Sequence, residues 1–302
     1  MESIGFIGLG AMGRPMASNL LKQGFALHVY DTRESAMQAL TALGAQACHS
    51  VAELTRQVDI VITMLPNSAD VESVVLGADG VLANARENAQ DDLLLIDMST
   101  IAPASTDKLA SALGEAGVAF VDAPVGRTVA FAERGESLFM VGASHNDMGR
   151  VKPILEGMGT VIHHCGQPGS GIRTKLINNF IAIAVCQINA EAFALAQKFG
   201  LDPAQTLAVV TGTTATNGHL TTAWPAKVFA GDIEPGFRID LARKDLALAL
   251  DAARQANVAL PTGAAACESL SLACNIDDFA GKDFSALLDV ACQLAQTDLI
   301  RL

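Results

Sequence analysis

The sequence predicts an open, doubly wound α/β sheet followed by an all-helical domain, with a long helix joining the two. Two observations lead to this prediction. In the first half, short and almost continuously apolar runs alternate with helical patterns, which is typical of parallel strands covered on both faces. Beyond about residue 167 the strand-like runs stop and only helical patterns follow. We therefore expect two domains, at 1–166 and 167–302.

Five apolar runs form the predicted sheet of the first domain, and two later runs extend it. The predicted strands are IGFIGLG (4–10), ALHVYD (26–31), DIVITML (59–65), LLLIDMS (93–99), AFVDAPV (119–125), SLFMVGA (137–143) and TVIHHCG (160–166). Intervening helices are predicted at 12–23, 34–42 and 104–116. A strand followed by a helix, repeated along the chain, implies right-handed crossovers in a largely parallel sheet.

The second domain begins after the glycine-rich joint GQPGSG (166–171). The segment 172–198 is apolar around much of its circumference, which predicts one long and largely buried helix. The further predicted helices are 203–211, 240–256, 261–274 and 284–297.

Composition restricts the classes of partner. The chain has 302 residues, of which 50% are hydrophobic and 17% charged, and its formal net charge is −12. A packed globular protein is expected, and this charge argues against nucleic acid or an anionic membrane as the main partner. The amino-terminal sequence shows no signal peptide and no apolar run is long enough to span a bilayer, so we expect a soluble, cytoplasmic chain. The six cysteines form no CxxC pair, which predicts reduced thiols and no metal site.

The motif GLGAMG follows the first predicted strand and opens the first predicted helix. Gly8 permits a tight turn, Gly10 lets the backbone approach a pyrophosphate, and Gly13 allows close helix packing. Together with Ala11 and Met12, they place backbone N–H groups at a helix start, where phosphate is bound. The alternative interpretation is a glycine turn with only a structural role. The flanking strand and helix favour a dinucleotide site at residues 8–13.

Asp31 ends the second predicted strand, at the distance from the glycines that a dinucleotide site requires. Its carboxylate would bind the ribose hydroxyls and repel a 2′-phosphate, so NAD(H) is the expected cofactor. Arg33 could offset that repulsion or be merely solvated. Leu65, Pro66 and Thr100 fall at the ends of later strands, at the edge where such sheets bind ligands, and are expected to line the cofactor path.

One face of the long helix carries polar groups. Lys175, Asn178, Asn179 and Ala182 fall at i, i+3, i+4 and i+7. A lysine can donate the proton that carbonyl reduction requires, and the carboxamides can orient a substrate. The alternative is a solvent-exposed helix start with solvated cations. Lys244 in a later helix is a candidate for closing over the cofactor, or else one half of a surface pair with Asp245.

Five segments together resemble the β-hydroxyacid dehydrogenase family, in the right order and over essentially the whole chain. They are GFIGLGAMGRPMASNL, IDMSTIAP, DAPVGRT, GSGIRTKLINN and LARKDLALALD. The resemblance implies a Rossmann domain, a helical domain like the C-terminal domain of 6-phosphogluconate dehydrogenase, and assembly as a homodimer or homotetramer. It implies that Lys175 is the catalytic lysine, that residues 8–13 bind the pyrophosphate, and that Lys244 belongs to the active site.

The chain departs from the family after DAPV. Most members carry Ser-Gly-Gly there, whereas this chain has Gly126, Arg127 and Thr128. This departure, with GHLTTAWPAKV at 218–228, resembles the branch that reduces 3-sulfolactaldehyde with NADH to 2,3-dihydroxypropane-1-sulfonate in sulfoquinovose breakdown. A guanidinium suits a small anionic aldehyde of this kind, and Thr128 and Asn179 would bind the remaining sulfonate oxygens. A salt bridge between Arg127 and Asp122 is the structural alternative.

Several other functions remain open. A reductase of tartronate or succinate semialdehyde, or a 3-hydroxyisobutyrate dehydrogenase, is the near alternative, because arginine also binds carboxylates. An imine reductase would typically lack Lys175. A non-catalytic dinucleotide-binding module would keep the glycines and Asp31 but would need neither Lys175 nor the two asparagines.

Overall fold

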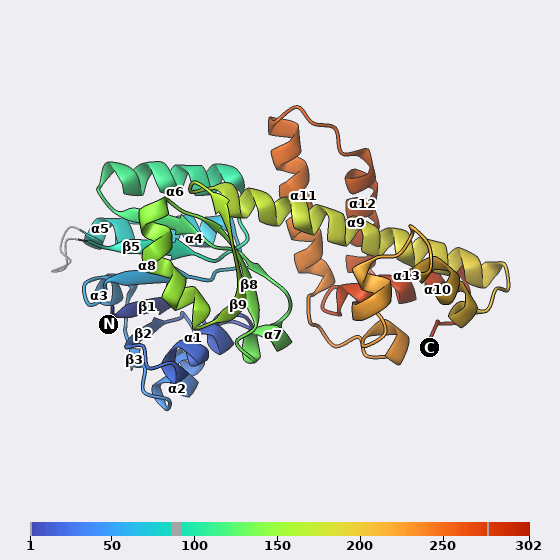
Figure 1. Ribbon diagram of the computed structural model, residues 1–302, viewed down its shortest axis with the longest axis horizontal. Coiled ribbons are helices and arrows are strands. Elements are labelled where there is room, and N and C mark those ends of the chain that lie inside the picture. The colour runs from blue at the N-terminus through green and yellow to red at the C-terminus, as the bar shows by residue number, and fades with distance from the viewer. Residues whose placement is uncertain (1, 86–91, 277) are drawn as a thin grey trace. The chain divides into compact units, whose positions relative to one another are not determined.

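The computed structural model describes residues 2–85, 92–276 and 278–302 (Figure 1). These residues form two compact units that divide between Lys175 and Leu176. We call them the sheet unit and the helical unit, and each is described by itself. The division falls inside the long helix, whereas the change in sequence pattern falls before it, at about residue 167.

The described part of the sheet unit contains a nine-stranded sheet in the order β3-β2-β1-β4-β5-β6-β8-β7, with β9 paired to β8. The strands are β1 (Ile4–Ile7), β2 (Leu27–Tyr30), β3 (Gln46–Ala47), β4 (Ile60–Thr63), β5 (Leu94–Asp97), β6 (Ala119–Asp122), β7 (Val125–Gly126), β8 (Ser137–Gly142) and β9 (Gly159–Gly166). The pairs from β3 through β6 are all parallel, which confirms the doubly wound sheet.

The last two predicted strands do extend the sheet, but β8 runs antiparallel to both β6 and β7. The reason is the short connection before it. Only the small helix α7 (Val129–Glu133) lies between β7 and β8. The chain therefore turns back instead of crossing over, and β9 then pairs with β8 in parallel.

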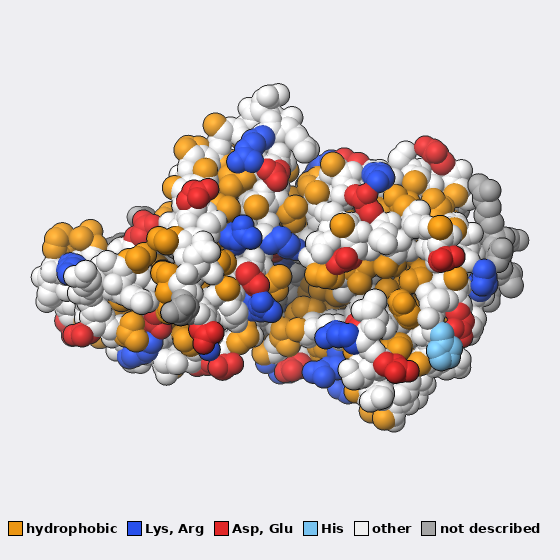
Figure 2. Space-filling model, turned by 180° about the vertical axis from the view of Figure 1, so that it is seen from behind, with side chains coloured by type: hydrophobic (Ala, Val, Ile, Leu, Met, Phe, Trp, Pro, Cys, Tyr) orange, Lys and Arg blue, Asp and Glu red, His pale blue; other side chains and the backbone are white. Residues whose placement is uncertain are grey.

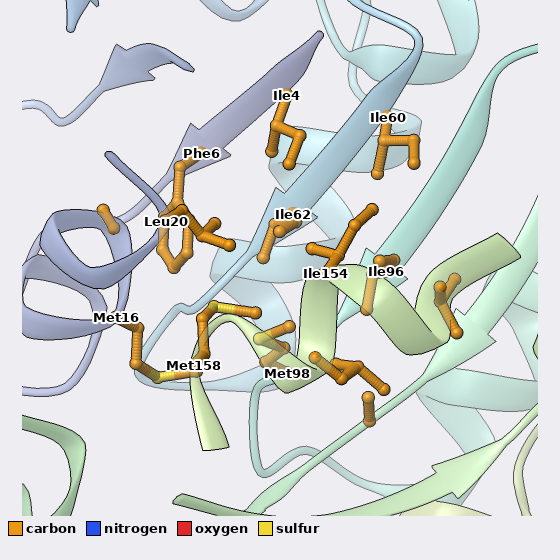
Figure 3. Close-up of a cluster of buried hydrophobic side chains, with 14 of the residues drawn as sticks. Ile4, Phe6, Met16, Leu20, Ile60, Ile62, Ile96, Met98, Ile154 and Met158 are labelled. Atoms are coloured by element: carbon orange, nitrogen blue, oxygen red, sulfur yellow. The ribbon is translucent and has the colours of Figure 1, made fainter. Parts of the chain in front are cut away.

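Helices cover both faces of this sheet, as the continuous apolar strands require. Successive side chains of a strand point to opposite faces of the sheet, and each face has its own core cluster. Ile60 and Ile62 of β4 belong to the first cluster and Val61 to the second. Figure 3 shows the first cluster, where side chains of β1, β4 and β5 meet those of α1 and α8. The remaining helices of the unit are α1 (Gly13–Lys22), α2 (Glu34–Thr41), α3 (Val51–Thr55), α4 (Ser68–Leu76), α5 (Val81–Ala85), α6 (Pro103–Glu115) and α8 (His145–Glu156).

The long helix α9 (Ser170–Lys198) starts two residues before its predicted position and leads into the helical unit. The other elements are α10 (Pro203–Thr211), η1 (His219–Ala223), η2 (Val228–Ala230), α11 (Ile239–Gln255), α12 (Pro261–Cys274), η3 (Phe284–Ala286) and α13 (Leu287–Ala295). Phe193 of α9 packs against the rings of Trp224 and Phe229 at centroid distances of 6.1 and 5.7 Å. The contact with Trp224 is edge-on and the contact with Phe229 is tilted, and all three residues belong to the core of this unit.

Among the described helices, α9 alone is long and apolar enough to cross a membrane by length and composition. In its most apolar window, 56% of the helix is buried inside the protein. Ile183 and Cys186 are among the residues that it contributes to the core of the helical unit. Burial in this core accounts for part of its apolar character, whereas other apolar side chains of the helix, such as Ile177 and Leu195, are exposed.

Charged side chains of both signs are interspersed over the face of the molecule shown in Figure 2. All six cysteines are free thiols. Within the described residues, no group of three or more His, Cys, Asp or Glu side chains is placed to hold a metal ion.

Candidate active site

The loop between β1 and α1 has the backbone geometry that its glycines predict. Gly8 has φ +95°, a conformation that glycine adopts without strain, and a Cβ there would collide with the Met64 carbonyl oxygen. A Cβ at Gly13 would collide with the Gly8 carbonyl oxygen. Nothing lies within 4 Å of the Cβ position of Gly10. The loop is thus tightly packed at Gly8 and Gly13 and has free space at Gly10. Backbone contact with a pyrophosphate requires such free space.

Asp31 directly follows β2 and is tied to this loop. One carboxylate oxygen accepts a hydrogen bond of 2.8 Å from the Leu9 N–H. The other accepts bonds from the N–H and Nε of Arg33, at 2.9 and 3.1 Å. Burial raises the pKa of Asp31, but the hydrogen bonds from Arg33 and Leu9 outweigh it and leave the pKa below its ordinary value. The carboxylate is therefore an anion at neutral pH.

A buried network links the loops after β4 and β5. Asp97 accepts hydrogen bonds from Thr63 Oγ1 at 2.8 Å and from the Ser99 N–H at 3.1 Å. Ser99 Oγ in turn accepts one from the Leu65 N–H at 2.9 Å. These two loops carry the predicted cofactor contacts, of which Leu65 and Thr100 are half-buried and Pro66 is exposed. Sequence reasoning missed Asp97, although its position at the end of a strand was a usable signal.

Arg127 occupies an unusual backbone conformation after β7. Its φ is +70°, in the left-handed region that side chains other than glycine rarely adopt. The exposed guanidinium donates to the Glu136 carbonyl oxygen at 2.5 Å and lies 5.1 Å from the centre of the Phe131 ring. Phe131 also contacts the guanidinium of Arg134, at 4.6 Å.

The residues on either side of Arg127 differ in burial. Gly126 is buried at the end of β7, and Thr128 is half-buried immediately before α7. Asp122, the acid considered as a partner for Arg127, makes its hydrogen bonds with backbone groups instead. Its two carboxylate oxygens accept hydrogen bonds from the backbone N–H groups of Gly169 and Ile172, each at 2.6 Å.

Those two bonds fix the start of α9, the helix that carries Lys175. Lys175 is only 9% exposed, which excludes the interpretation of a solvated lysine. Arg173 is exposed, as that interpretation expects, but its guanidinium pairs with Asp107 at 2.7 Å. Burial raises the pKa of Asp122 to about 6 despite the two backbone donors.

In the helical unit, the carboxamides of α9 form a connected chain with α11. Asn178 Nδ2 donates to Asn179 Oδ1 at 3.0 Å, and Asn179 Nδ2 donates to Asp245 Oδ2 at 2.7 Å. Lys244 Nζ lies 3.2 Å from the other oxygen of Asp245. The Asp245 side chain is 4% exposed, so the Lys244–Asp245 pair is not an ordinary surface pair. Sequence reasoning named Asp245 only as a neighbour of Lys244.

Ala182 lies one turn further along α9 and is half-buried, and its carbonyl accepts a hydrogen bond of 2.8 Å from His219 Nε2. The His219 ring packs edge-on against Phe284 at 5.3 Å. Trp224 is fully buried. His219 and Trp224, the two aromatic residues of the segment 218–228, therefore pack within the helical unit.

Comparisons with known proteins agree with this architecture. Residues 3–166 match the NAD binding domain of 6-phosphogluconate dehydrogenase, and residues 169–291 match the NAD-binding model of NADP-dependent 3-hydroxyisobutyrate dehydrogenase. The chain is 44% identical over 289 residues to 3-sulfolactaldehyde reductase of Escherichia coli, covering 96% of this chain and 95% of that protein. It is 40% identical to 2-(hydroxymethyl)glutarate dehydrogenase of Eubacterium barkeri, covering 87% and 86%.

Among solved structures, 3-hydroxyisobutyrate dehydrogenase of Mycobacterium tuberculosis with L-serine superimposes with a TM-score of 0.88 and 35% identity, covering 96% of this chain and 99% of that one. The chain therefore belongs to the β-hydroxyacid dehydrogenase family. It is an NAD-dependent oxidoreductase whose cofactor is a nicotinamide dinucleotide.

Proposed function

We propose that the protein reduces 3-sulfolactaldehyde to 2,3-dihydroxypropane-1-sulfonate with NADH, a step in sulfoquinovose breakdown. The observation that carries this proposal is Arg127 in its left-handed conformation. A side chain at positive φ costs on the order of 1–2 kcal/mol relative to glycine. Such strain persists where the residue serves a function. We infer that the arginine is retained for its guanidinium.

The guanidinium of Arg127 suits a sulfonate because it stays charged and offers several donors in a planar fork. The side chain is exposed, and it is held by the Phe131 ring and the Glu136 carbonyl. The hydroxyl of Thr128 and the carboxamide of Asn179 would bind the remaining sulfonate oxygens, beside the backbone of Gly126.

Lys175 is the proposed proton donor. The bound nicotinamide would supply a hydride to the aldehyde carbon, and the carbonyl oxygen would then take a proton from the Lys175 ammonium. The same charge would stabilise the negative charge that develops on this oxygen. Because Lys175 is 9% exposed, little water competes with that interaction.

Asn178, Asn179 and Ala182 would line the substrate side of α9. Asn179 uses one N–H on Asp245 and its carbonyl oxygen on Asn178, which leaves its second N–H for a ligand. A carboxamide with a fixed orientation can hold the bound substrate in the geometry that hydride transfer requires. Asp245 thus acts on the substrate through Asn179.

The cofactor residues fit NADH. The open face above Gly10 admits a pyrophosphate, with the backbone of Gly8, Ala11, Met12 and Gly13 around it. Anionic Asp31 would bind the adenosine ribose and disfavour a 2′-phosphate. The proposed path continues along Leu65, Pro66 and Thr100, and Lys244 is proposed as a further cofactor-binding residue.

Similarity supports the sulfonate most directly, since the E. coli relative named for this reaction is 44% identical along nearly the whole chain. The competing proposal is a carboxylate substrate, such as succinate or tartronate semialdehyde or 3-hydroxyisobutyrate. The M. tuberculosis dehydrogenase structure with L-serine, at 35% identity, favours this alternative, because an arginine also binds carboxylates.

Initial-rate NADH oxidation with purified protein separates these substrates. We expect kcat/KM for 3-sulfolactaldehyde to exceed that for either carboxylate semialdehyde at least about 100-fold, which corresponds to roughly 2.7 kcal/mol of transition-state binding. Arg127→Gly should remove most of this preference, whereas Arg134→Gly, which alters the other guanidinium on Phe131, should keep it. Equal or better rates on a carboxylate would replace the sulfonate proposal and leave the family assignment intact.

We further propose that the protein acts in the cytoplasm as a homodimer or homotetramer. Apolar side chains line one side of α9 and are exposed in the single chain. They are Ile177 (62% exposed), Ile181 (55%), Ile188 (49%) and Leu195 (53%), and Phe199 (70%) follows directly after the helix. An exposed apolar stripe of this length is typical of a protein interface.

A further inference from the structure

Asp122 binds the first turn of α9 from a distant strand. Its side chain lies at the carboxyl end of β6 and the residue is 1% exposed. One oxygen accepts from the Gly169 N–H and the other from the Ile172 N–H, each at 2.6 Å. The N–H groups at the start of a helix have no partner within the helix, so Asp122 satisfies them in place of a local cap.

Two glycines clear the space for this contact. A Cβ at Gly142 of β8 would collide with one carboxylate oxygen of Asp122. A Cβ at Gly171 would lie 2.9 Å from the other oxygen. The positions of β8 and α9 that face the Asp122 carboxylate are therefore glycines, which have no side chain.

Lys175 follows Ile172 by less than one helical turn. Because a helix is rigid over this distance, the position of its first turn sets the position of the lysine Cα. Another side-chain anchor of this turn is the exposed Arg173–Asp107 pair, of the kind that contributes little to stability. The buried bonds to Asp122 are the stronger of the two.

We propose that Asp122 is a positioning residue for Lys175. By holding the first turn of α9 against the end of β6, it sets where the lysine ammonium meets the substrate oxygen. The proposal rests on the assignment of Lys175 as proton donor. A misplacement of about 1 Å at such a group costs on the order of 100-fold in rate.

Asp122→Asn tests this directly, because it replaces one acceptor oxygen with an amide donor that faces a backbone N–H. We expect kcat to fall on the order of 100-fold, while KM for NADH stays within about twofold. The substrate is whichever test aldehyde the wild-type protein reduces fastest. The matched control is Asp107→Asn, which breaks the surface anchor of the same turn and should leave kcat within about twofold.

Amine labelling followed by mass spectrometry gives a readout that needs no turnover. In Asp122→Asn, a loosened first turn should make Lys175 react at least about fivefold faster than in the wild-type protein. Lys152, an exposed residue of α8, serves as the internal reference. Labelling and kcat should change together in Asp122→Asn and should stay unchanged in Asp107→Asn.

Gly142→Ala provides a second test if Asp122→Asn fails to fold, since the added methyl collides with the same carboxylate and also with backbone atoms of Gln167 and Gly171 at the start of α9. It should lower kcat and speed Lys175 labelling in the same way. A folded variant of either kind with wild-type kcat and wild-type labelling overturns the proposal. If the wild-type protein reduces no test aldehyde, the proposed function fails, and Lys175 labelling alone then decides the positioning role.

Discussion

The Asn179 carboxamide of α9 donates a hydrogen bond of 2.7 Å to the Asp245 carboxylate of α11, and both residues are buried. This bond fixes which side of the carboxamide faces away from Asp245. It also joins the proposed substrate helix to the helix that carries Lys244, since Lys244 Nζ pairs with the same carboxylate at 3.2 Å.

Replacing Asp245 with Ala should therefore damage both stability and turnover. The change leaves a buried Asn179 donor without its acceptor, which costs about 1–3 kcal/mol in the free energy of unfolding. We expect kcat to fall about 10- to 100-fold as the carboxamide loses its orientation. Urea unfolding and initial rates measure the two effects. Asp251→Ala on the exposed side of α11 is the control, and equal effects from both variants would contradict the prediction.

The strained backbone at residue 127 predicts an order of stability among variants. Arg127→Ala keeps the side chain at positive φ but loses the contact with Phe131, whereas Arg127→Gly loses the contact and relieves the strain. The glycine variant should be more stable than the alanine variant by about 1 kcal/mol. Thermal unfolding compares them. A more stable alanine variant would show that the loop does not hold the φ of residue 127 near +70°.

The buried carboxyl of Asp97 predicts how stability changes with pH. Burial raises its pKa to about 6 from an ordinary value of 3.8. Between these values the unfolded chain releases the proton while the folded protein retains it, so this group's contribution to stability falls as pH rises from about 4 to 6. Asp122 contributes in the same direction, because burial also raises its pKa to about 6.

Asp97→Asn should remove one of these two contributions. The amide oxygen can still accept the bonds from Thr63 and Ser99, so the fold should persist. We expect the free energy of unfolding of this variant to depend less on pH between about 4 and 6 than that of the wild-type protein. Urea titrations at several pH values would show this, and parallel curves for the two proteins would refute it.

Asp31 and Arg33 predict a switch in cofactor preference. Asp31→Ser removes the anion that disfavours a 2′-phosphate and releases the exposed Arg33 guanidinium from its pair. The ratio of kcat/KM for NADPH to that for NADH should rise at least about tenfold. The double variant with Arg33→Ala should lose most of that gain. A rise that is equally large without Arg33 would exclude its role in binding the phosphate.

The exposed stripe on α9 predicts an effect on assembly. Ile188→Glu places a charge at a position that is 49% exposed in the single chain, so the subunit itself should still fold. A buried charge in an oligomer interface is costly, and the variant should sediment as a smaller species. Val258→Glu, at a position 55% exposed outside the stripe, should sediment like the wild-type protein.

The sequence was most informative where periodicity and glycine spacing determine structure. The parallel strands, the glycine loop and the long helix follow from such patterns. Very short helices such as α3 and α7 escaped prediction because they have too few turns for an apolar period to appear, and the longer helices α4 and α8 were missed as well. Their signal was in the caps instead: Ser50, Asn67 and Ser144 each accept a backbone N–H bond at a helix start.

Asp122 shows a different limit of sequence reasoning. Its identity suggested a charged partner such as Arg127, but its partners are two backbone N–H groups, 47 and 50 residues further along the chain. Backbone donors are the same at every residue except proline, so no side-chain pattern in the sequence marks them. Only the approach of α9 to the end of β6 reveals the contact.

The positive φ at residue 127 also bears on how substrate range can change during evolution. A glycine adopts such a left-handed backbone without strain, so an arginine can replace a glycine here without a new course for the chain. Many glycine codons become arginine codons through one base change. A permanent cation can thus enter the proposed substrate site in a single step, at a cost in strain that the rest of the fold tolerates.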